Sequence, residues 1–533
     1  RDLRMSRGLG DVYKRQVLGA GTNRMNIYVV RQATQGLANW VKTQGGSQTV
    51  AISYDSRIKS DVFAKVAAGV FAANGVKVNI WPVLMPVPTV SFATRYLHTS
   101  AGVMVTASHN PGKYNGYKVY GADGCQITTE AAAEILAEIE KLDIFADVKT
   151  SDFEAGVTSG NIQYIPDEVY TAFVNEVKNQ SVLFGEEVNK DVAIVYSPLN
   201  GTGLKPVTRT LKEMGYTNIT VVKEQEQPDG NFPTCPYPNP EIKEAMALGM
   251  EYAKKCNADL LLATDPDCDR VGIAVKNKAG EYELLTGNQI GCVLLHYILS
   301  TKQKQGTLPK NGAAVKSIVS TSLANKIAAS FGVEMFETLT GFKFIGEKIQ
   351  QFQDTGSHTF LFGFEESYGF LSSTFVRDKD GVNASLLIAE VACACAAQGI
   401  TLYDYVQSIF REYGYFVEKV VSKTLPGKDG LTRMKEIMKD LRENPPKELC
   451  GMKVTAVRDY LKGTRTADGK VEPTGLPKSD VLYFELEKGN WVCVRPSGTE
   501  PKIKLYVNTN ASDKADAEKL NADLRVASEA LLD

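Results

Sequence analysis

The stretch Thr49-Val50-Ala51-Ile52-Ser53-Tyr54 is a mostly apolar run that ends just before a charged turn, Asp55-Ser56-Arg57. Such a run predicts a buried strand. From about Ser60 the apolar residues recur at helical spacing until Gly75, and 76–80 is a second strand-like run. A strand, a helix and a strand of these lengths form a βαβ unit, so the fold should contain a parallel sheet.

The same order of elements begins again twice along the chain. One strand is predicted over 191–196, with a helix through Leu211, and another over 313–319, with a helix over 322–331. Three such starts predict three related α/β units.

The pattern changes after about Glu412. Short strand-like runs follow at 453–457, 481–486 and 491–495, and the chain ends on a polar helix. This order predicts a smaller C-terminal α+β domain with an antiparallel sheet.

Composition limits the class of protein. The 533 residues allow several domains, and the net charge of −2 gives no reason to expect nucleic acid or a membrane surface as a partner. No apolar run approaches the roughly 20 residues that span a bilayer. The nine cysteines form no C-x-x-C pair, so we expect neither structural zinc nor disulfides, and a cytoplasmic location.

Ser108 stands in a polar turn, Thr106-Ala107-Ser108-His109-Asn110-Pro111, directly after a strand-like run at 101–105. The end of such a strand is where open α/β sheets bind ligands. The turn is either an ordinary capped turn or the carrier of a covalent phosphoryl group. Because sequence neighbours rarely share one face, we do not expect His109 to be the base for Ser108. Lys118 is the better candidate, if burial or nearby cations lower its pKa.

Three alternating carboxylates, Asp265, Asp267 and Asp269, stand between strand-like runs at 258–263 and 271–275. Such carboxylates can converge on one point, and all-oxygen ligation suits Mg²⁺. An EF-hand is excluded, because its sixth and twelfth positions hold Arg270 and Lys276. A solvated acidic turn is the alternative.

Two further loops carry groups suited to a sugar and to an anion. Gly363-Phe364-Glu365-Glu366-Ser367-Tyr368-Gly369 places acceptors between glycines. Arg495-Pro496-Ser497-Gly498-Thr499-Glu500-Pro501-Lys502 offers hydroxyls, backbone N–H groups and a guanidinium to an anion. Each is alternatively a simple strand junction. The last loop lacks the G-x-x-x-x-G-K-[ST] pattern, so a P-loop kinase is not indicated.

Together and in this order, the four loops resemble the active-serine, metal, sugar and phosphate loops of the α-D-phosphohexomutases, the phosphoglucomutase/phosphomannomutase family, and most of all its bacterial phosphoglucomutases. The resemblance runs from about residue 17 to the C-terminus. It implies three related α/β domains with mixed, mainly parallel sheets and a C-terminal α+β domain, around a central cleft. The implied domains are 17–190 (active serine), 191–310 (metal), 311–411 (sugar) and 412–533 (phosphate).

The first sixteen residues do not fit this resemblance. Residues 1–16 are basic and lack clear periodicity, whereas family members begin with a loop that touches the substrate phosphate. We expect this segment to be a non-family or artefactual N-terminus, with part of the first domain missing.

The resemblance also implies roles for individual residues. The catalytic residues are expected to be Ser108, His109 and Lys118, with His109 touching phosphate. The metal ligands are expected to be Ser108, through its phosphate, and Asp265, Asp267 and Asp269. The substrate-binding residues are expected to be Arg24, Arg270, Thr340, Gly341, Lys343, Glu365, Ser367, Lys379, Arg495, Ser497, Gly498 and Thr499.

The implied activity interconverts glucose 1-phosphate and glucose 6-phosphate through a phosphoserine enzyme and a 1,6-bisphosphate. Mg²⁺ and glucose 1,6-bisphosphate are the expected cofactors, a small sugar phosphate is the partner, and the protein should be a monomer or weak dimer. A mannose or pentose phosphate is the alternative substrate. From other classes, a metal-dependent sugar phosphatase and an inactive phosphosugar-binding protein remain open.

Overall fold

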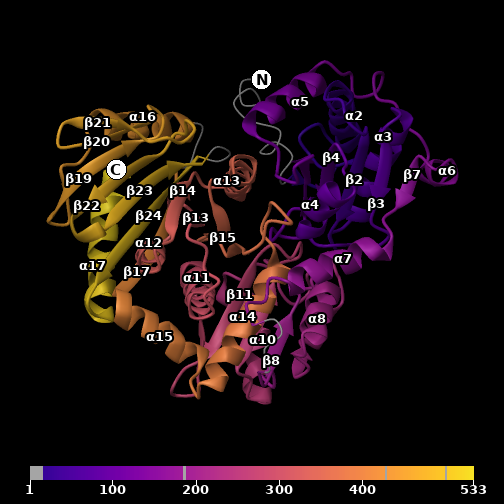
Figure 1. The fold of residues 1–533 in the computed structure, drawn as a ribbon. Coiled ribbons are helices and arrows are strands. Elements are labelled where there is room, and N and C mark those ends of the chain that lie inside the picture. The colour runs from indigo at the N-terminus through magenta and orange to yellow at the C-terminus, as the bar shows by residue number, and fades with distance from the viewer. Residues whose placement is uncertain (1–15, 184–187, 426–428, 498–500, 533) are drawn as a thin grey trace. The chain divides into compact units, whose positions relative to one another are not determined.

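The computed structural model describes residues 16–183, 188–425, 429–497 and 501–532, and Figure 1 shows its fold. The chain divides into two compact units, Arg1–Val315 with Gly341–Tyr405, and Lys316–Thr340 with Val406–Asp533. The four domain boundaries expected from the sequence are finer than this division and stay predictions.

The first sheet of unit 1 has the order β6-β4-β2-β3-β7. Its strands are β2 (Thr49–Tyr54), β3 (Lys77–Ile80), β4 (Ala101–Val105), β6 (Tyr117–Gly121) and β7 (Ile162–Tyr164). β2 pairs in parallel with β3 and β4, β3 pairs in parallel with β7, and β6 is antiparallel to β4. The predicted βαβ unit is therefore confirmed.

Helices cover both faces of this sheet (Figure 1). They are α2 (Ile27–Thr43), α3 (Ser60–Ala73), α4 (Val87–Tyr96), α5 (Thr129–Glu140), α6 (Phe153–Thr158) and α7 (Asp167–Lys178). The main core lies between the sheet and α2, α3 and α5. On the other face, Val87 and Val90 of α4 pack on Met104 and Tyr120. A short pair, β1 (Gln16–Val17) with β5 (Tyr114–Asn115), lies outside this sheet.

The second sheet of unit 1 has the order β12-β11-β10-β8-β9. Its strands are β8 (Ile194–Ser197), β9 (Ile219–Val221), β10 (Leu260–Thr264), β11 (Val271–Lys276) and β12 (Tyr282–Leu284). The accompanying helices are α8 (Leu204–Glu213), α9 (Lys223–Glu226), α10 (Lys243–Cys256) and α11 (Gly287–Lys304). β10 is parallel to β8 but antiparallel to β11, so the acidic stretch forms the turn of a hairpin. The strand predicted at 191–196 begins later, at Ile194.

The third α/β segment comprises β13 (Gly312–Ser317), α12 (Leu323–Ser330), β14 (Glu334–Thr338), α13 (Phe342–Thr355), β15 (Thr359–Glu365), β16 (Gly369–Leu371), α14 (Gly381–Ala397) and α15 (Leu402–Tyr413). β15 and β16 form an antiparallel hairpin, so Glu365 lies opposite Gly369 at its turn. α14 is buried along most of its length.

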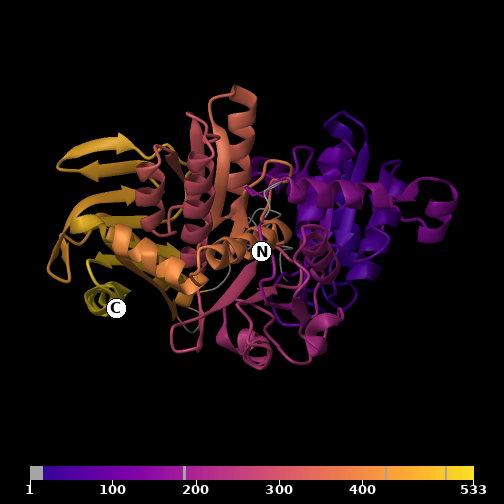
Figure 2. The ribbon, with the colours of Figure 1, turned by 60° about the horizontal axis from the view of Figure 1, so that its bottom comes forward.

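Most of unit 2 is an antiparallel sheet in the order β17-β24-β23-β22-β19-β20-β21, with β18 beside β19. The strands are β17 (Tyr415–Thr424), β18 (Glu448–Leu449), β19 (Met452–Asp459), β20 (Thr464–Ala467), β21 (Lys470–Pro473), β22 (Leu482–Leu486), β23 (Trp491–Pro496) and β24 (Lys502–Ala511). Helices α16 (Gly430–Glu443) and α17 (Lys514–Glu529) share a core with this sheet, and Figure 2 shows α17, the yellow helix near the C-terminus, along it. The predicted C-terminal α+β domain is confirmed.

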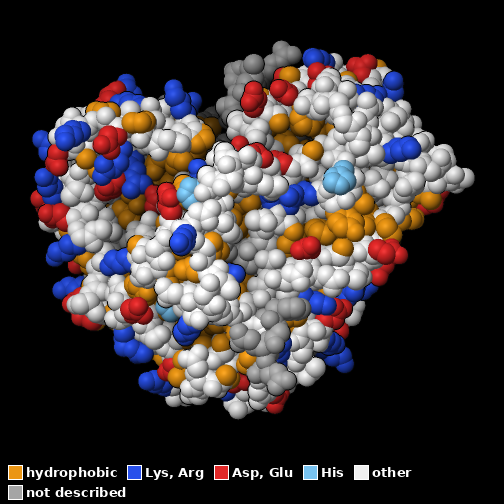
Figure 3. All heavy atoms as spheres, in the orientation of Figure 1, with side chains coloured by type: hydrophobic (Ala, Val, Ile, Leu, Met, Phe, Trp, Pro, Cys, Tyr) orange, Lys and Arg blue, Asp and Glu red, His pale blue; other side chains and the backbone are white. Residues whose placement is uncertain are grey.

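The surface carries both signs of charge, which are interspersed over the face in Figure 3. In the described part of the chain no single helix is long and apolar enough to cross a membrane. Taken together, α14 and α15 have the length and apolar composition of a membrane-spanning segment, but they are bent by 88° relative to each other.

Candidate active site

The serine turn sits where two parallel strands end side by side. Asp55 directly follows β2 and Thr106 directly follows β4. The Thr106 hydroxyl donates to Asp55 Oδ2 at 2.6 Å. Thr106 Oγ1 in turn accepts the backbone N–H of Ser108 at 2.8 Å. Ser108 has a φ of 53°, which is a left-handed backbone conformation. This conformation is uncommon for residues other than glycine, asparagine and aspartate. Such strain is typical of functional turns.

The hydroxyl of Ser108 contacts two side chains of the site, those of Asp265 and His109. Its Oγ donates to Asp265 Oδ2 at 2.7 Å and lies 3.2 Å from His109 Nδ1. Ser108 and His109 therefore share a face although they are neighbours in the sequence, and the prediction that Lys118 rather than His109 is the base stays a prediction. The left-handed backbone at Ser108 turns the two adjacent side chains toward each other.

Arg57 holds the whole serine turn from behind. Its guanidinium donates to four backbone carbonyls, those of Ser108, Asn110, Pro111 and Tyr114. The side chain is fully buried and lies 3.4 Å from Asp55 Oδ2. A planar fork with five N–H donors suits this task, since it can satisfy several carbonyls at fixed angles.

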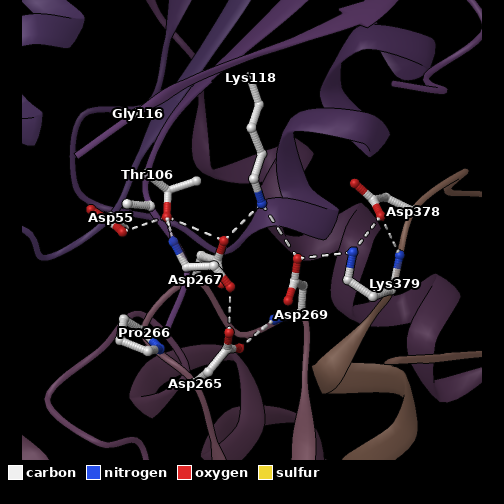
Figure 4. A network of polar contacts seen from close by, with 12 residues as sticks. Asp55, Thr106, Gly116, Lys118, Asp265, Pro266, Asp267, Asp269, Asp378 and Lys379 are labelled. Atoms are coloured by element: carbon white, nitrogen blue, oxygen red, sulfur yellow. Dashed lines mark hydrogen bonds and ion pairs between the residues drawn. The ribbon is translucent and has the colours of Figure 1, made fainter. Parts of the chain in front are cut away.

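The three aspartates converge as the sequence predicted (Figure 4). One oxygen from each of Asp265, Asp267 and Asp269 lies within 4.8 Å of the others, and all three side chains are buried. The hairpin turn brings them together, with Asp265 Oδ1 accepting the backbone N–H groups of Asp269 and Arg270. Among the described residues, Asp267 Oδ1 and Asp269 Oδ1 have no hydrogen-bond partner.

These features fit a divalent cation. Burial, and then the charges of Asp267 and Asp269, raises the pKa of Asp265 well above its usual range. Burial also acts to raise the pKa of Asp267, but Lys118 and a hydrogen bond from Asp265 outweigh it and bring the pKa to about 2. Three adjacent buried carboxylates cannot all ionise without added positive charge. Buried oxygens without donors are the ligands that Mg²⁺ prefers, so the triad can hold a metal ion.

Two lysines supply positive charge beside the triad (Figure 4). Lys118 Nζ lies 3.0 Å from Asp267 and 3.5 Å from Asp269, and Lys379 Nζ lies 3.2 Å from Asp269 and from Asp378. Burial acts to lower the pKa of Lys118, but the two aspartates outweigh it and raise the pKa. Lys118 is thus a charged ammonium in this arrangement, and the lowered pKa on which a role as base depends is absent here.

The sugar loop adjoins the metal loop. Arg270 forms an isolated bridge with Gly369, where an added Cβ would meet Lys379 Cδ at 2.2 Å. Glu365 is buried and accepts the backbone N–H of Gly341 at 2.7 Å. The guanidinium of Arg270 pairs with Glu241, a residue that the sequence did not single out.

The other predicted substrate residues are not part of this network. The Arg24 side chain is exposed and forms no hydrogen bond or ion pair with the described residues, Lys343 lies over the Phe344 ring, and Ser367 lies in the β15–β16 turn. Thr340, Arg495 and Ser497 belong to unit 2. Gly498 and Thr499 lie outside the described residues.

Four residues of the network were not predicted: Asp55, Arg57, Thr106 and Asp378. Asp55 and Arg57 had a visible signal, because they follow the first predicted strand, whose end lies at the edge expected for ligands. Asp378 stands directly before the predicted Lys379 and accepts from Tyr120 and Gln126.

Family models match all four parts of the chain. They are the phosphoglucomutase/phosphomannomutase α/β/α domains I (residues 11–144), II (171–280) and III (286–413), and the C-terminal domain of the same family (434–526). The first match begins within the segment expected to be foreign to the family, so the boundary at residue 16 stays a prediction.

Similar proteins carry the same family name. A phosphoglucomutase of Staphylococcus aureus is 38% identical over 511 residues, covering 95% of this chain and 90% of its own, and one of Staphylococcus haemolyticus is 36% identical over 497 residues, covering 93% and 89%. In fold, the chain resembles the phosphoglucomutase parafusin of Paramecium in its open form, with a TM-score of 0.73, 20% identity and coverage of 98% and 94%. A putative phosphomannomutase of Thermus thermophilus gives a TM-score of 0.70 at 22% identity, with 97% of both chains covered.

The chain belongs to the phosphoglucomutase/phosphomannomutase family. It is an enzyme of intramolecular phosphoryl transfer that interconverts glucose phosphates.

Proposed function

We propose that the protein moves a phosphoryl group between positions 1 and 6 of glucose through a phosphorylated Ser108. One observation carries this proposal: the Ser108 hydroxyl lies 2.7 Å from Asp265, at the rim of the aspartate triad. A phosphoryl group on that oxygen would therefore adjoin the cation site.

In the first half-reaction, the 6-hydroxyl of glucose 1-phosphate attacks the phosphorus of phosphoserine. A new P–O bond forms to the sugar, the bond from phosphorus to Ser108 Oγ breaks, and the hydroxyl proton passes through the base to Ser108 Oγ. The product is glucose 1,6-bisphosphate. After the intermediate turns over, Ser108 Oγ attacks the phosphorus at position 1, the bond from that phosphorus to O1 of the sugar breaks, and the serine proton passes to O1. Phosphoserine is restored and glucose 6-phosphate is released.

The residues around the triad divide the work by chemistry. Mg²⁺ held by Asp265, Asp267 and Asp269 would neutralise charge on the transferred group. Arg57 and Thr106 fix the serine turn, and Glu365 offers a buried acceptor for sugar hydroxyls. We propose that Arg24, Arg270, Thr340, Gly341, Lys343, Ser367 and Lys379 contact the sugar phosphate, while Arg495, Ser497, Gly498 and Thr499 hold the phosphate that does not react.

Proton transfer is assigned to Lys118, with His109 as a contact to phosphate. Lys118 can act as the base only if its pKa is lowered. The lysine is held charged by Asp267 and Asp269, so it can accept a proton only when the charge of these carboxylates is shared with a cation.

The test is a coupled assay that follows glucose 6-phosphate formed from glucose 1-phosphate, with and without a trace of glucose 1,6-bisphosphate. Phosphate at Ser108 is measured by intact mass and site mapping. We expect Ser108→Ala to lose nearly all turnover and the phosphate. Ser159→Ala, an exposed serine at the end of α6, is the matched control and should retain both.

Other outcomes would identify the other candidates. Full activity of Ser108→Ala would refute the proposal. Release of inorganic phosphate from sugar phosphates would indicate a phosphatase, and binding without turnover an inactive phosphosugar-binding protein. Faster turnover of mannose 1-phosphate or ribose 1-phosphate would reassign the substrate.

We also propose a cytoplasmic location, which all nine cysteines support because each is a free thiol. A monomer or weak dimer remains our proposal for the oligomeric state, to be measured by sedimentation.

A further inference from the structure

A pocket lies within unit 1, and its lining differs from the candidate active site. It has a volume of about 780 Å³ and is formed by α4, the C-terminal half of α13, the start of β15, and residues before β13, before β15 and after β16. None of the residues assigned to phosphoryl transfer lines it. Its size falls in the range of about 300–1,000 Å³ that small-molecule sites occupy.

Two arginines share one carbonyl at the wall of this pocket, and neither has an acidic partner among the residues that the structure describes. Arg95 lines the pocket and donates to the carbonyl oxygen of Thr374, to which Arg377 also donates. Arg377 is fully buried, and its remaining contacts are the side-chain oxygens of Gln350 and Gln353. Among the described residues, neither guanidinium has a carboxylate within the 4.0 Å of an ion pair.

The positive charge at this point is therefore poorly compensated. Burial, followed by the charge of Arg95, lowers the pKa of Arg377 to about 10, and burial lowers that of Arg95. Asp123 and Asp354 act on the pair only from a distance. The Arg377 Nε is buried and has no partner among the described residues. Proteins rarely keep buried charges unpaired, since each costs several kcal/mol in order of magnitude, and an anion on Arg95 would supply negative charge beside this pair.

The walls around Arg95 are aromatic. Phe92, Arg95 and Tyr96 lie on one face of α4, where the Phe92 and Tyr96 rings stack with centroids 5.2 Å apart. Phe375 meets Phe92 edge to face at 6.0 Å. The Tyr96 side chain is exposed, and its ring is available to a further planar group.

We propose that this pocket binds a nucleoside monophosphate, with the phosphate on Arg95 and the base against Tyr96. One Arg95 nitrogen bonds to Thr374, and the other two have no partner among the described residues, which leaves a fork for phosphate oxygens. A planar base has the shape that aromatic walls recognise by stacking. Neither inorganic phosphate nor a sugar phosphate contains such a planar base.

The pocket is joined to the active site by a short segment of chain. Thr374 and Arg377 stand just before Asp378 and Lys379, and Lys379 contacts the aspartate triad. Figures 1 and 2 show the segment after β16 beside α4. A ligand on Arg95 would therefore fix the start of segment 374–379, which carries Lys379. Binding of a nucleoside monophosphate in this pocket does not depend on the proposed function.

The test is calorimetric titration of the full chain with adenosine 5′-monophosphate, adenosine and inorganic phosphate. Each titration is done alone and in an equilibrated, saturating mixture of glucose 1-phosphate and glucose 6-phosphate, which fills the active site. We expect adenosine monophosphate to bind in both conditions, at least ~10-fold more tightly than either fragment.

Three variants locate the site. Arg95→Gln should weaken adenosine monophosphate by ~10-fold or more, and Tyr96→Ala, an exposed position that is safe for folding, by ~5-fold or more. Arg525→Gln, an exposed arginine on α17, is the control and should bind as the unmodified protein does. Thermal melting of each variant shows that it is folded.

The proposal is overturned by any of three results: no binding at millimolar concentration, loss of binding when sugar phosphates fill the active site, or equal affinity of Tyr96→Ala and the unmodified protein. Ser108→Ala separates this proposal from the proposed function, because that variant should lose turnover and still bind adenosine monophosphate.

Discussion

Replacing Arg57 with lysine tests whether the serine turn is held in place from behind. Arg57 donates to four backbone carbonyls of the turn and pairs with Asp55. Lysine keeps the charge beside Asp55, but its single ammonium cannot span those carbonyls. If one of the four contacts survives, three carbonyls lose a charged donor. At roughly 1–1.5 kcal/mol each, the three lost contacts lower the free energy of unfolding by about 3–4.5 kcal/mol.

The turnover of Arg57→Lys should fall by more than the loss of folded protein would explain. A shift of about 1 Å in a reacting group costs on the order of 100-fold in rate, and the Ser108 carbonyl itself accepts two hydrogen bonds from Arg57. We expect kcat of Arg57→Lys to fall about 100-fold, with a smaller change in KM, because the sugar-binding groups are elsewhere.

Urea unfolding and the coupled assay measure the two effects on the same preparation. Arg525→Lys, on the exposed face of α17, controls for the loss of a guanidinium. If Arg57→Lys unfolds at the same urea concentration as the unmodified protein and keeps turnover within twofold, the turn does not depend on Arg57 and the reasoning is wrong.

Three further predictions concern the metal, the sugar loop and pH. Dialysis against EDTA should abolish turnover and Mg²⁺ should restore it, while Asp269→Asn should raise the Mg²⁺ concentration needed by at least ~10-fold; undiminished turnover after dialysis would contradict a metal at the triad. Gly341→Ala should lower kcat/KM by roughly 10-fold, because φ is 125° at Gly341 and its N–H holds Glu365; equal kinetics would show that this contact is dispensable. Burial raises the pKa of Glu418 from its ordinary 4.5 to about 7, so its ionisation opposes folding: the contribution of Glu418 to stability is fully present below pH 4.5 and roughly 3 kcal/mol is lost as pH rises through 7. Urea midpoints of Glu418→Gln between pH 4.5 and 8 should lack that fall, and parallel curves for both proteins would refute the assignment.

The sequence predicted those parts of the site that depend on local pattern. The strand before Ser108, the strand ahead of Asp55 and the hairpin strands around the aspartates were all evident from apolar runs. The Asp265–Asp269 spacing was informative because alternate residues of a tight turn converge whatever surrounds them. In each case the physical cause lies within a few residues along the chain.

Contacts between distant segments were not predictable in this way. Arg57 and Ser108 are 51 positions apart, and nothing in either segment shows that one guanidinium would bind four carbonyls of the other. The contact between Ser108 and His109 was not predictable either, because the left-handed backbone of Ser108 is not visible in the sequence.

By itself the sequence determined the α/β units, the antiparallel C-terminal sheet and the chemistry of each loop, since these follow from periodicity and residue type. Only the tertiary structure decided which charges meet. It surrounded Lys118 with Asp267 and Asp269 and so kept it charged, and it brought Arg95 and Arg377 together with no carboxylate of the described residues in ion-pair distance. The charge state of a buried group depends on which charged groups the fold places within a few ångströms of it. The distance between residues far apart in the sequence cannot be read from the sequence itself.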